Sequence, residues 1–444
     1  MESEILRQLK EAYPTVEAQR ARLRELVNNF GSLSDSEAKF TVGDILCLAN
    51  LLYEAGEEEI IYDLREQLIA LERQYRRDET YLRNLEYLNK FLTSFKPTIF
   101  RSITRYFCEH YHVNPDLVTC LPKVTGQQVG AKVEIKRFPE DMHPILFHVK
   151  AHQEFCSKSH PQFIVITSDG TGTVDFKELF IYRFLEYIGY GSKVHFIVDA
   201  DIAHSRVDEG ILIATQDLSY TKRPTERNKS FKTFREMREE LTSTPIEGIA
   251  RKTRQDIVAI DMLSRAFLLE DVMINQGNFG LTTATSFFGD SSSSIKWRII
   301  DFIPPPLRTE IGDDYSYVRH YPHAREIFYS FRIGNASHPY NREGLEIVCQ
   351  ILSEEKAGSL WLPAVERITQ GDGHHLPLTV AADKAFTDIV SFMEKNKEIL
   401  CIKPDRLVRR IDDLRNYQTH AVQNFTELEQ GLREYLAVQH SNSS

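Results

Sequence analysis

Apolar residues recur at helical spacing through residues 1–96, where no proline occurs between Pro14 and Pro97. The clearest sets are Leu64, Leu68 and Leu71, followed by Leu82, Leu85 and Leu88. Steps of three and four positions place such residues on one side of an α-helix. Ser34 ahead of Glu37 adds a helix-start pattern. Residues 1–96 are therefore predicted to form a helical accessory domain, with a partner-binding helical module as the alternative.

Short apolar runs bounded by Gly, Asp and Pro replace this periodicity from about residue 117. The predicted strands follow Val133 to Phe138, Ile145 to Val149, Phe163 to Ile166, His195 to Val198 and Ile211 to Ala214. One amphipathic helix, from Phe176 to Ile188, interrupts them, and Gly189 is its expected end. Residues 97–218 are therefore predicted to form a β-rich lobe with a single helix.

Helical periodicity returns from Gln255 to Leu269 and again from residue 340 to the end. The last part carries an apolar stripe made of Leu407, Ile411, Leu414, Ala421, Phe425, Leu428, Leu432 and Tyr435. This stripe favours a helix docked on the core over a coiled coil. We therefore expect a helical lobe over 219–340 and a helical extension over 341–444, which together predict an α+β, two-lobed protein.

Composition and charge restrict the class of protein. The 444 residues are 42% hydrophobic and 27% charged, the balance of an ordinary folded protein, which excludes a wholly disordered chain. The formal net charge of −10 argues against a nucleic-acid binder, and no apolar run is long enough for a transmembrane span. The six cysteines form no CxxC pair, and no apolar leader follows Met1, so a reducing, cytoplasmic location is expected.

Candidate chemistry lies in the predicted helical lobe. A loop with Asp271 and Asn278 precedes a short hairpin, and Asp301 closes an apolar strand about twenty residues later. This is the layout of a phosphoryl-transfer site, which needs an oxygen group beside the nucleophile and oxygen ligands for a metal. Mg²⁺ and Mn²⁺ prefer such ligands. The ordinary structural alternatives are a turn at Asn278 and a turn cap at Asp301.

The segments Asn278-Phe279-Gly280-Leu281 and Ile299-Ile300-Asp301-Phe302 resemble the atypical protein-kinase-like superfamily, especially HipA-type kinases and phosphatidylinositol kinases. The resemblance covers about residues 117–310 and implies a two-lobed kinase fold that binds ATP with Mg²⁺ or Mn²⁺. It makes Asn278 and Asp301 the metal ligands. It also makes Glu178 the partner of the ATP-binding lysine, although a glutamate early in a helix has a simpler explanation in the helix dipole.

Two positions depart from the family pattern. The family's catalytic aspartate lies five residues before the metal-binding Asn, and that position is Met273 here. Asp271 is the replacement candidate for positioning the acceptor. Otherwise the chain is a pseudokinase or a kinase-fold enzyme that transfers another group. The family's Asp-Phe-Gly reads Asp-Phe-Ile at Asp301.

The ATP-binding lysine has one candidate. Lys150 ends the strand His148-Val149-Lys150, which resembles the Val-Ala-Ile-Lys pattern of kinases. Gly126 and Gly130 lie upstream, where they would form a loop that covers the phosphates. In the alternative assignment, Phe163 to Thr167 is the strand before the helix, and no lysine then stands at the expected place.

The basic segment 222–238 has two interpretations, a solvated loop or a site for an inositol polyphosphate or phosphoinositide. Taken together, the patterns predict a metal-dependent atypical protein kinase that phosphorylates a protein. The alternative from another class is a helical adaptor or polyanion-binding protein. Divergent kinase-like domains flanked by helical domains also resemble effectors that bacteria secrete into a host cell, and the acidic residues Glu427, Glu429 and Glu434 are similar to their tail signals.

Overall fold

The computed structural model describes the protein in two compact units, and each is considered by itself. Unit 1 comprises Met1–His152 and His195–Gln216, and unit 2 comprises Gln153–Val194 and Asp217–Ser444. The described residues are 4–57, 59–94, 99–123, 130–151, 176–198, 211–219, 226–237, 251–269, 272, 277–286, 296–302, 357–400 and 402–442.

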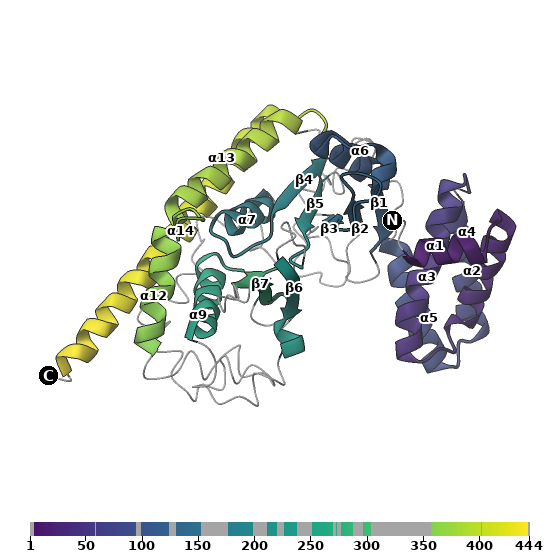
Figure 1. Cartoon of the computed structure of the whole chain (residues 1–444), viewed down its shortest axis with the longest axis horizontal. Coiled ribbons are helices and arrows are strands. Elements are labelled where there is room, and N and C mark those ends of the chain that lie inside the picture. The colour runs from purple at the N-terminus through teal and green to yellow at the C-terminus, as the bar shows by residue number, and fades with distance from the viewer. Residues whose placement is uncertain are drawn as a thin grey trace. The chain divides into compact units, whose positions relative to one another are not determined.

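The N-terminal part of unit 1 is helical, as predicted (Figure 1). Its helices are α1 (Glu4–Ala12), α2 (Val16–Phe30), α3 (Asp35–Glu54), α4 (Ile60–Gln74) and α5 (Glu79–Ser94). The predicted start at Ser34 is a capping box, because the Ser34 hydroxyl accepts from the Glu37 amide and the Glu37 carboxylate accepts from the Ser34 amide. Leu23, Val27 and Leu85 are among the side chains that are fully buried in the bundle.

A five-stranded sheet forms the rest of unit 1. Its strands are β1 (Val118–Pro122), β2 (Gly130–Ile135), β3 (Ile145–Ala151), β4 (Val194–Val198) and β5 (Ile211–Gln216), in the order β1-β2-β3-β5-β4. Four of the predicted strands correspond to β2, β3, β4 and β5, and the fifth, at Phe163 to Ile166, lies outside the described residues. The sequence pattern did not predict β1 or helix α6 (Ile99–Tyr111).

The two faces of this sheet differ in polarity. Val133 on β2 and Phe147 and Val149 on β3 are buried on one face, where Phe107 of α6 packs 4.8 Å from the Phe147 ring. The alternate positions Lys132, Glu134, His148 and Lys150 are all more exposed. One face is therefore apolar and covered, and the other carries the sheet's charged side chains.

Unit 2 combines helices with a second, smaller sheet. Its described elements are α7 (Phe176–Tyr187), β6 (Glu226–Thr233), α9 (Arg251–Ala266), β7 (Phe279–Ser286), β8 (Lys296–Ile299), α12 (Ala357–Gln370), α13 (Leu378–Asn396) and α14 (Pro404–Asn442). The antiparallel order β6-β7-β8 contains the predicted hairpin, and the predicted helices coincide with α7, α9 and the C-terminal helices. Part of the basic segment 222–238 is a strand, β6, and not a loop.

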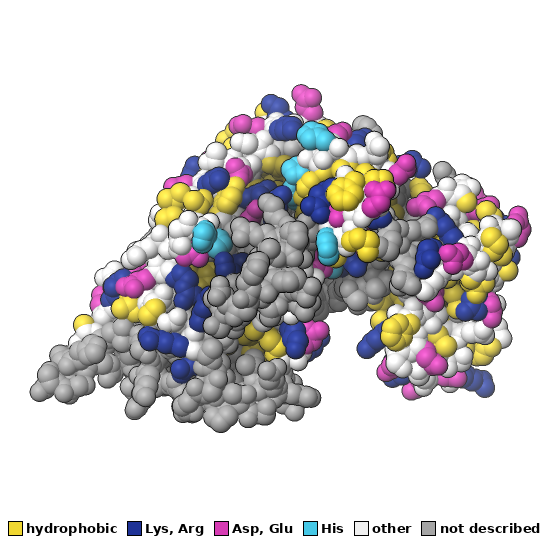
Figure 2. Space-filling view, viewed as in Figure 1, with side chains coloured by type: hydrophobic (Ala, Val, Ile, Leu, Met, Phe, Trp, Pro, Cys, Tyr) yellow, Lys and Arg dark blue, Asp and Glu magenta, His cyan; other side chains and the backbone are white. Residues whose placement is uncertain are grey.

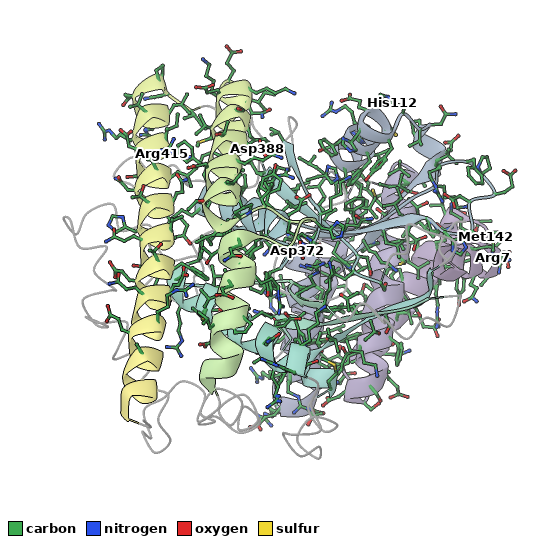
Figure 3. The ribbon with its side chains drawn as sticks, turned by 60° about the vertical axis from the view of Figure 1, so that its left-hand side comes forward. Arg7, His112, Met142, Asp372, Asp388 and Arg415 are labelled. Carbon is green, nitrogen blue, oxygen red and sulfur yellow. The ribbon has the colours of Figure 1, made fainter. Side chains whose placement is uncertain are left out.

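The predicted apolar stripe of the last helix faces the core. Leu414, Ala421, Phe425 and Leu428 of α14 are buried, and the Tyr417 hydroxyl donates a 2.6 Å hydrogen bond to the Phe267 carbonyl after α9. Helices α13 and α14 run side by side, with Asp388 and Arg415 labelled on them (Figure 3). The docked helix is thus confirmed.

The charged surface and the polarity of the helices are those expected from the composition. Basic and acidic side chains are interspersed on the face of the described residues in Figure 2. Among those residues, no helix is both long enough and apolar enough to cross a membrane.

Candidate functional site

The β7–β8 hairpin brings the two predicted metal ligands together. Phe279 pairs with Ile299, so Asn278 and Asp301 lie just beyond the paired ends of the two strands. The Asn278 carbonyl accepts backbone hydrogen bonds from Ile300 (2.8 Å) and Asp301 (3.3 Å). The hairpin register therefore determines the distance between these two residues, and a shift of one residue would separate them.

An aromatic cluster beneath the hairpin holds this register. Phe234, just after β6, stacks on Phe279 with ring centroids 5.0 Å apart, and Trp297 lies 5.9 Å from Phe279. All three side chains are at most 1% exposed. Their burial stabilises the hairpin that carries Asn278 and Asp301.

Helix α7 fixes the Asp301 carboxylate. The Tyr182 hydroxyl and the Phe302 amide donate hydrogen bonds of 3.2 and 3.1 Å to the same oxygen, Oδ1. The Phe302 ring also packs 4.5 Å from the Tyr182 ring, and both side chains are buried. The carboxylate therefore has a defined orientation against α7.

Glu178 lies on the same helix, four residues before Tyr182. Residues at this spacing share one side of a helix, so Glu178 and the tyrosine that binds Asp301 lie one turn apart. Glu178 is fully buried and the preceding Lys177 is 2% exposed. Charged side chains are seldom buried to this extent in a helix unless they are paired. A favourable interaction with the helix dipole alone therefore does not explain why Glu178 is buried.

The remaining predicted ATP-binding residues lie in unit 1. Gly130 and Lys150 are direct partners in the β2–β3 ladder. A Cβ atom on Gly130 would lie 2.1 Å from the Val149 carbonyl oxygen, so this close approach of the strands requires glycine. Since Lys150 belongs to unit 1 and Glu178 to unit 2, their pairing stays a prediction.

Three predicted positions lie outside the described residues, namely Asp271, Gly126 and the departure at Met273. Within the part of the chain that the structure describes, no group of three or more His, Cys, Asp or Glu side chains could hold a metal. An Asn–Asp pair still fits Mg²⁺ or Mn²⁺, since these ions complete their coordination with phosphate oxygens and water. The donor set therefore suits a cation that arrives with a nucleotide, and does not suit a permanently held structural metal.

A second polar cluster lies at the other end of α7 and was missed by sequence reasoning. The Tyr190 hydroxyl donates to Asp256 of α9 (3.4 Å), and Arg367 of α12 forms an ion pair with the same carboxylate. Burial raises the pKa of Asp256, while the Arg367 charge opposes this shift. These contacts join residues more than 60 positions apart, so no local spacing could indicate them.

The loop before α13 completes this cluster. His375 donates to Asp372 through its backbone amide (2.9 Å), and its ring lies where a side chain at Gly189 would be. Partial burial opposes ionisation of Asp372, but the hydrogen bond with the His375 ring and backbone amides hold its pKa at about 2. Gly189, the predicted end of α7, is thus also the residue that the His375 ring of this loop approaches.

No protein-family model, curated protein sequence or solved structure matches this chain.

Proposed function

We propose that this protein is an ATP-dependent phosphotransferase in which Asn278 and Asp301 hold a divalent cation. The observation that carries the proposal is the hydrogen bond from Tyr182 on α7 to the Asp301 carboxylate. It joins the Asp motif to the glutamate-bearing helix, and the β7–β8 hairpin joins the Asp motif to the Asn motif. Their meeting within unit 2 supports a common site.

Each residue has a distinct role in this proposal. Asn278 and Asp301 offer amide and carboxylate oxygens to Mg²⁺ or Mn²⁺, which neutralises charge on the ATP phosphates when bound. By the kinase resemblance, Lys150 would bind the phosphates, Gly126 and Gly130 would belong to the loop that covers them, and Glu178 would be the partner of this lysine. Within unit 2, Tyr182 keeps Asp301 in one orientation for the cation.

Asp271 positions the hydroxyl of the acceptor, for which we propose a protein side chain. Because Met273 occupies the usual position of the catalytic aspartate, ATP binding without transfer is the alternative within the same fold. Lys232 and Arg235, on and after β6, are exposed, which supports segment 222–238 as a surface for an inositol polyphosphate.

The test is nucleotide binding and γ-phosphate transfer with Mg²⁺ and with Mn²⁺, each with and without an inositol polyphosphate. Asp301→Asn should remove cation-dependent ATP binding and any transfer together. The structure supplies a matched control, because Tyr187 on α7 donates to Asp388 on α13 in the same way as Tyr182 donates to Asp301. Asp388→Asn should leave nucleotide binding at the wild-type level.

The outcomes separate the alternatives. Tyr182→Phe should weaken cation-dependent ATP binding by about 10-fold or more, the value of one hydrogen bond to a charged group, whereas Tyr187→Phe should not. Binding without transfer by the wild type would favour the pseudokinase. Absence of nucleotide binding under all conditions would refute the proposal and favour the helical adaptor.

A further inference from the structure

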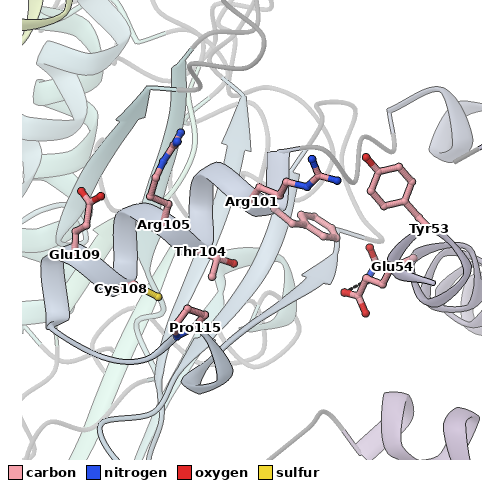
Figure 4. A pocket seen from close by; sticks show the side chains of 10 residues that line it. Tyr53, Glu54, Arg101, Thr104, Arg105, Cys108, Glu109 and Pro115 are labelled. Carbon is pink, nitrogen blue, oxygen red and sulfur yellow. Dashed lines mark hydrogen bonds between the residues drawn. The ribbon is translucent and has the colours of Figure 1, made fainter. Parts of the chain in front are cut away.

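Unit 1 contains a pocket that the proposed phosphotransfer does not use. Its volume is about 690 Å³, within the range of ligand-binding pockets. Helices α3 and α6 form its walls (Figure 4). The lining residues are Asn50, Tyr53, Glu54, Phe100, Arg101, Thr104, Arg105, Cys108, Glu109 and Pro115.

Asn50 gives this pocket an unsatisfied acceptor. Its side chain is 1% exposed, and its Nδ2 donates a 3.0 Å hydrogen bond to Glu54, one turn further along α3. Its Oδ1 is buried and receives no hydrogen bond from the described residues. A buried acceptor without a donor is costly, so a ligand that brings an N–H group would be favoured here.

Two arginines line the α6 wall of the pocket. Arg101 and Arg105 are exposed on successive turns of α6, and Arg101 extends toward the α3 side in Figure 4. Neither arginine forms an ion pair with a described residue. The guanidinium fork matches a carboxylate or a phosphate, so the α6 wall is suited to an anionic group.

The acidic residues of the pocket decide between these anions. Glu54 and Glu109 balance the two arginines, so the formal charge of the lining is zero. A polyphosphate would bring several negative charges against these two carboxylates, whereas a single carboxylate brings one, so its like-charge repulsion is smaller. Phe100 and Pro115 add apolar surface for a side chain.

Covalent chemistry at the pocket's thiol is disfavoured. Burial and the neighbouring Glu109 charge raise the pKa of Cys108, so its thiol stays protonated near neutral pH. The pocket is therefore suited to non-covalent binding of a ligand.

We propose that this pocket binds the carboxyl end of a peptide chain. The terminal carboxylate pairs with Arg101, the last backbone N–H donates to Asn50 Oδ1, and the last side chain packs on Phe100. A protein C-terminus and a free N-acylated amino acid share this chemistry. The proposal does not depend on nucleotide binding.

The test uses the full-length protein and fluorescein-labelled peptide mixtures, each with one defined C-terminal residue behind randomised positions. At least one mixture should bind in a fluorescence anisotropy titration, and the same mixture with a C-terminal carboxamide should bind at least about 10-fold more weakly. Competition by the matching N-acetyl amino acid at similar affinity would identify a small molecule as ligand. Failure of this competitor would identify a protein tail.

Matched variants distinguish the pocket from other surfaces. Arg101→Gln should weaken binding about 10-fold or more, and Asn50→Leu should weaken it because it removes the acceptor of the ligand N–H. Arg83→Gln is the control, since Arg83 is an exposed arginine of α5 that does not line the pocket. Equal binding of carboxylate and carboxamide, no binding by any mixture, or equal effects of Arg101→Gln and Arg83→Gln would each overturn the proposal. Circular dichroism of each variant verifies that it is folded.

Discussion

The five-stranded sheet of unit 1 and the three-stranded sheet of unit 2 each carry a predicted site residue near a strand end, but they place it differently. In β3, the backbone register sets Lys150 opposite Gly130 on β2 and Ile213 on β5. After β8, hydrogen bonds from Tyr182 and Phe302 fix the Asp301 carboxylate itself. A position set by register tolerates changes in nearby side chains, whereas a position set by side-chain contacts does not.

The largest expected effect tests the aromatic support of the smaller sheet. Phe279→Ala should lower the free energy of unfolding by about 3–5 kcal/mol, because it leaves a cavity beside Phe234 and Trp297. Guanidinium unfolding followed by tryptophan fluorescence measures this, since both tryptophans, Trp297 and Trp361, belong to unit 2.

The control for this change is an exposed apolar residue of the same unit. Val408 is 59% exposed, and Val408→Ala should change the free energy of unfolding by no more than about 0.5 kcal/mol. Similar losses for both variants would contradict the importance of the aromatic cluster.

Glycines at matched places in the two sheets give the next largest effect. A Cβ atom at Gly130 would lie 2.1 Å from the Val149 carbonyl oxygen, and one at Gly280 would lie 2.3 Å from the Lys232 carbonyl oxygen. Gly130→Ala and Gly280→Ala should each cost about 1–3 kcal/mol, since the strands must separate. Far-UV circular dichroism during urea unfolding measures both, and a neutral result for either would show that its sheet can relax.

The smallest effect concerns pH, where aspartates of the two units should behave oppositely. Hydrogen bonds from the Arg137 side chain hold the pKa of Asp141 in unit 1 well below its ordinary value, despite some burial. Burial raises the pKa of Asp256 in unit 2. A lowered pKa contributes stability above the ordinary value of 3.8 that is lost as pH falls, and a raised pKa contributes stability at low pH that is lost as pH rises.

Asn variants measured from pH 7 to pH 3 test this opposition. The deficit of Asp141→Asn relative to wild type should shrink as pH falls below 3.8, by at most about 1 kcal/mol, because water screens the half-exposed Arg137. Asp256→Asn should instead gain relative to wild type as pH rises through the raised pKa. Parallel pH profiles of the two variants would contradict the assigned directions.

Local sequence patterns predicted the helices and strands in which apolar residues recur at a regular spacing. The N-terminal helices, the docked face of α14, the extent of α7 and the hairpin that pairs Asn278 with Asp301 all follow from spacing within one segment. The strand β6 was not predicted, because its charged residues suggested a solvated loop, yet it pairs with β7 on both sides of an irregularity between Arg227 and Ser230. Pairing with a partner strand outweighs composition in such a case.

The candidate site was predicted only in part for a related reason. Tyr182 and Asp301 are 119 positions apart, and only the folded chain shows that they meet. Helical spacing from Glu178 would have indicated Tyr182 as a residue on the same side. Charged residues such as Lys177 and Glu178 are seldom fully buried, and no local pattern indicates that packing in unit 2 buries both.

This buried pair of opposite charges restricts how α7 can move. Neighbouring residues on an α-helix point about 100° apart, because one turn contains 3.6 residues. The Lys177 ammonium lies 5.9 Å from the Tyr417 ring on α14, while Glu178 occupies a separate buried place. Rotation of α7 about its own axis by one residue would move both charges out of the buried places that they now occupy. The two buried charges therefore hold α7 at one rotation about its axis, and this rotation also sets the orientation of Tyr182 toward Asp301.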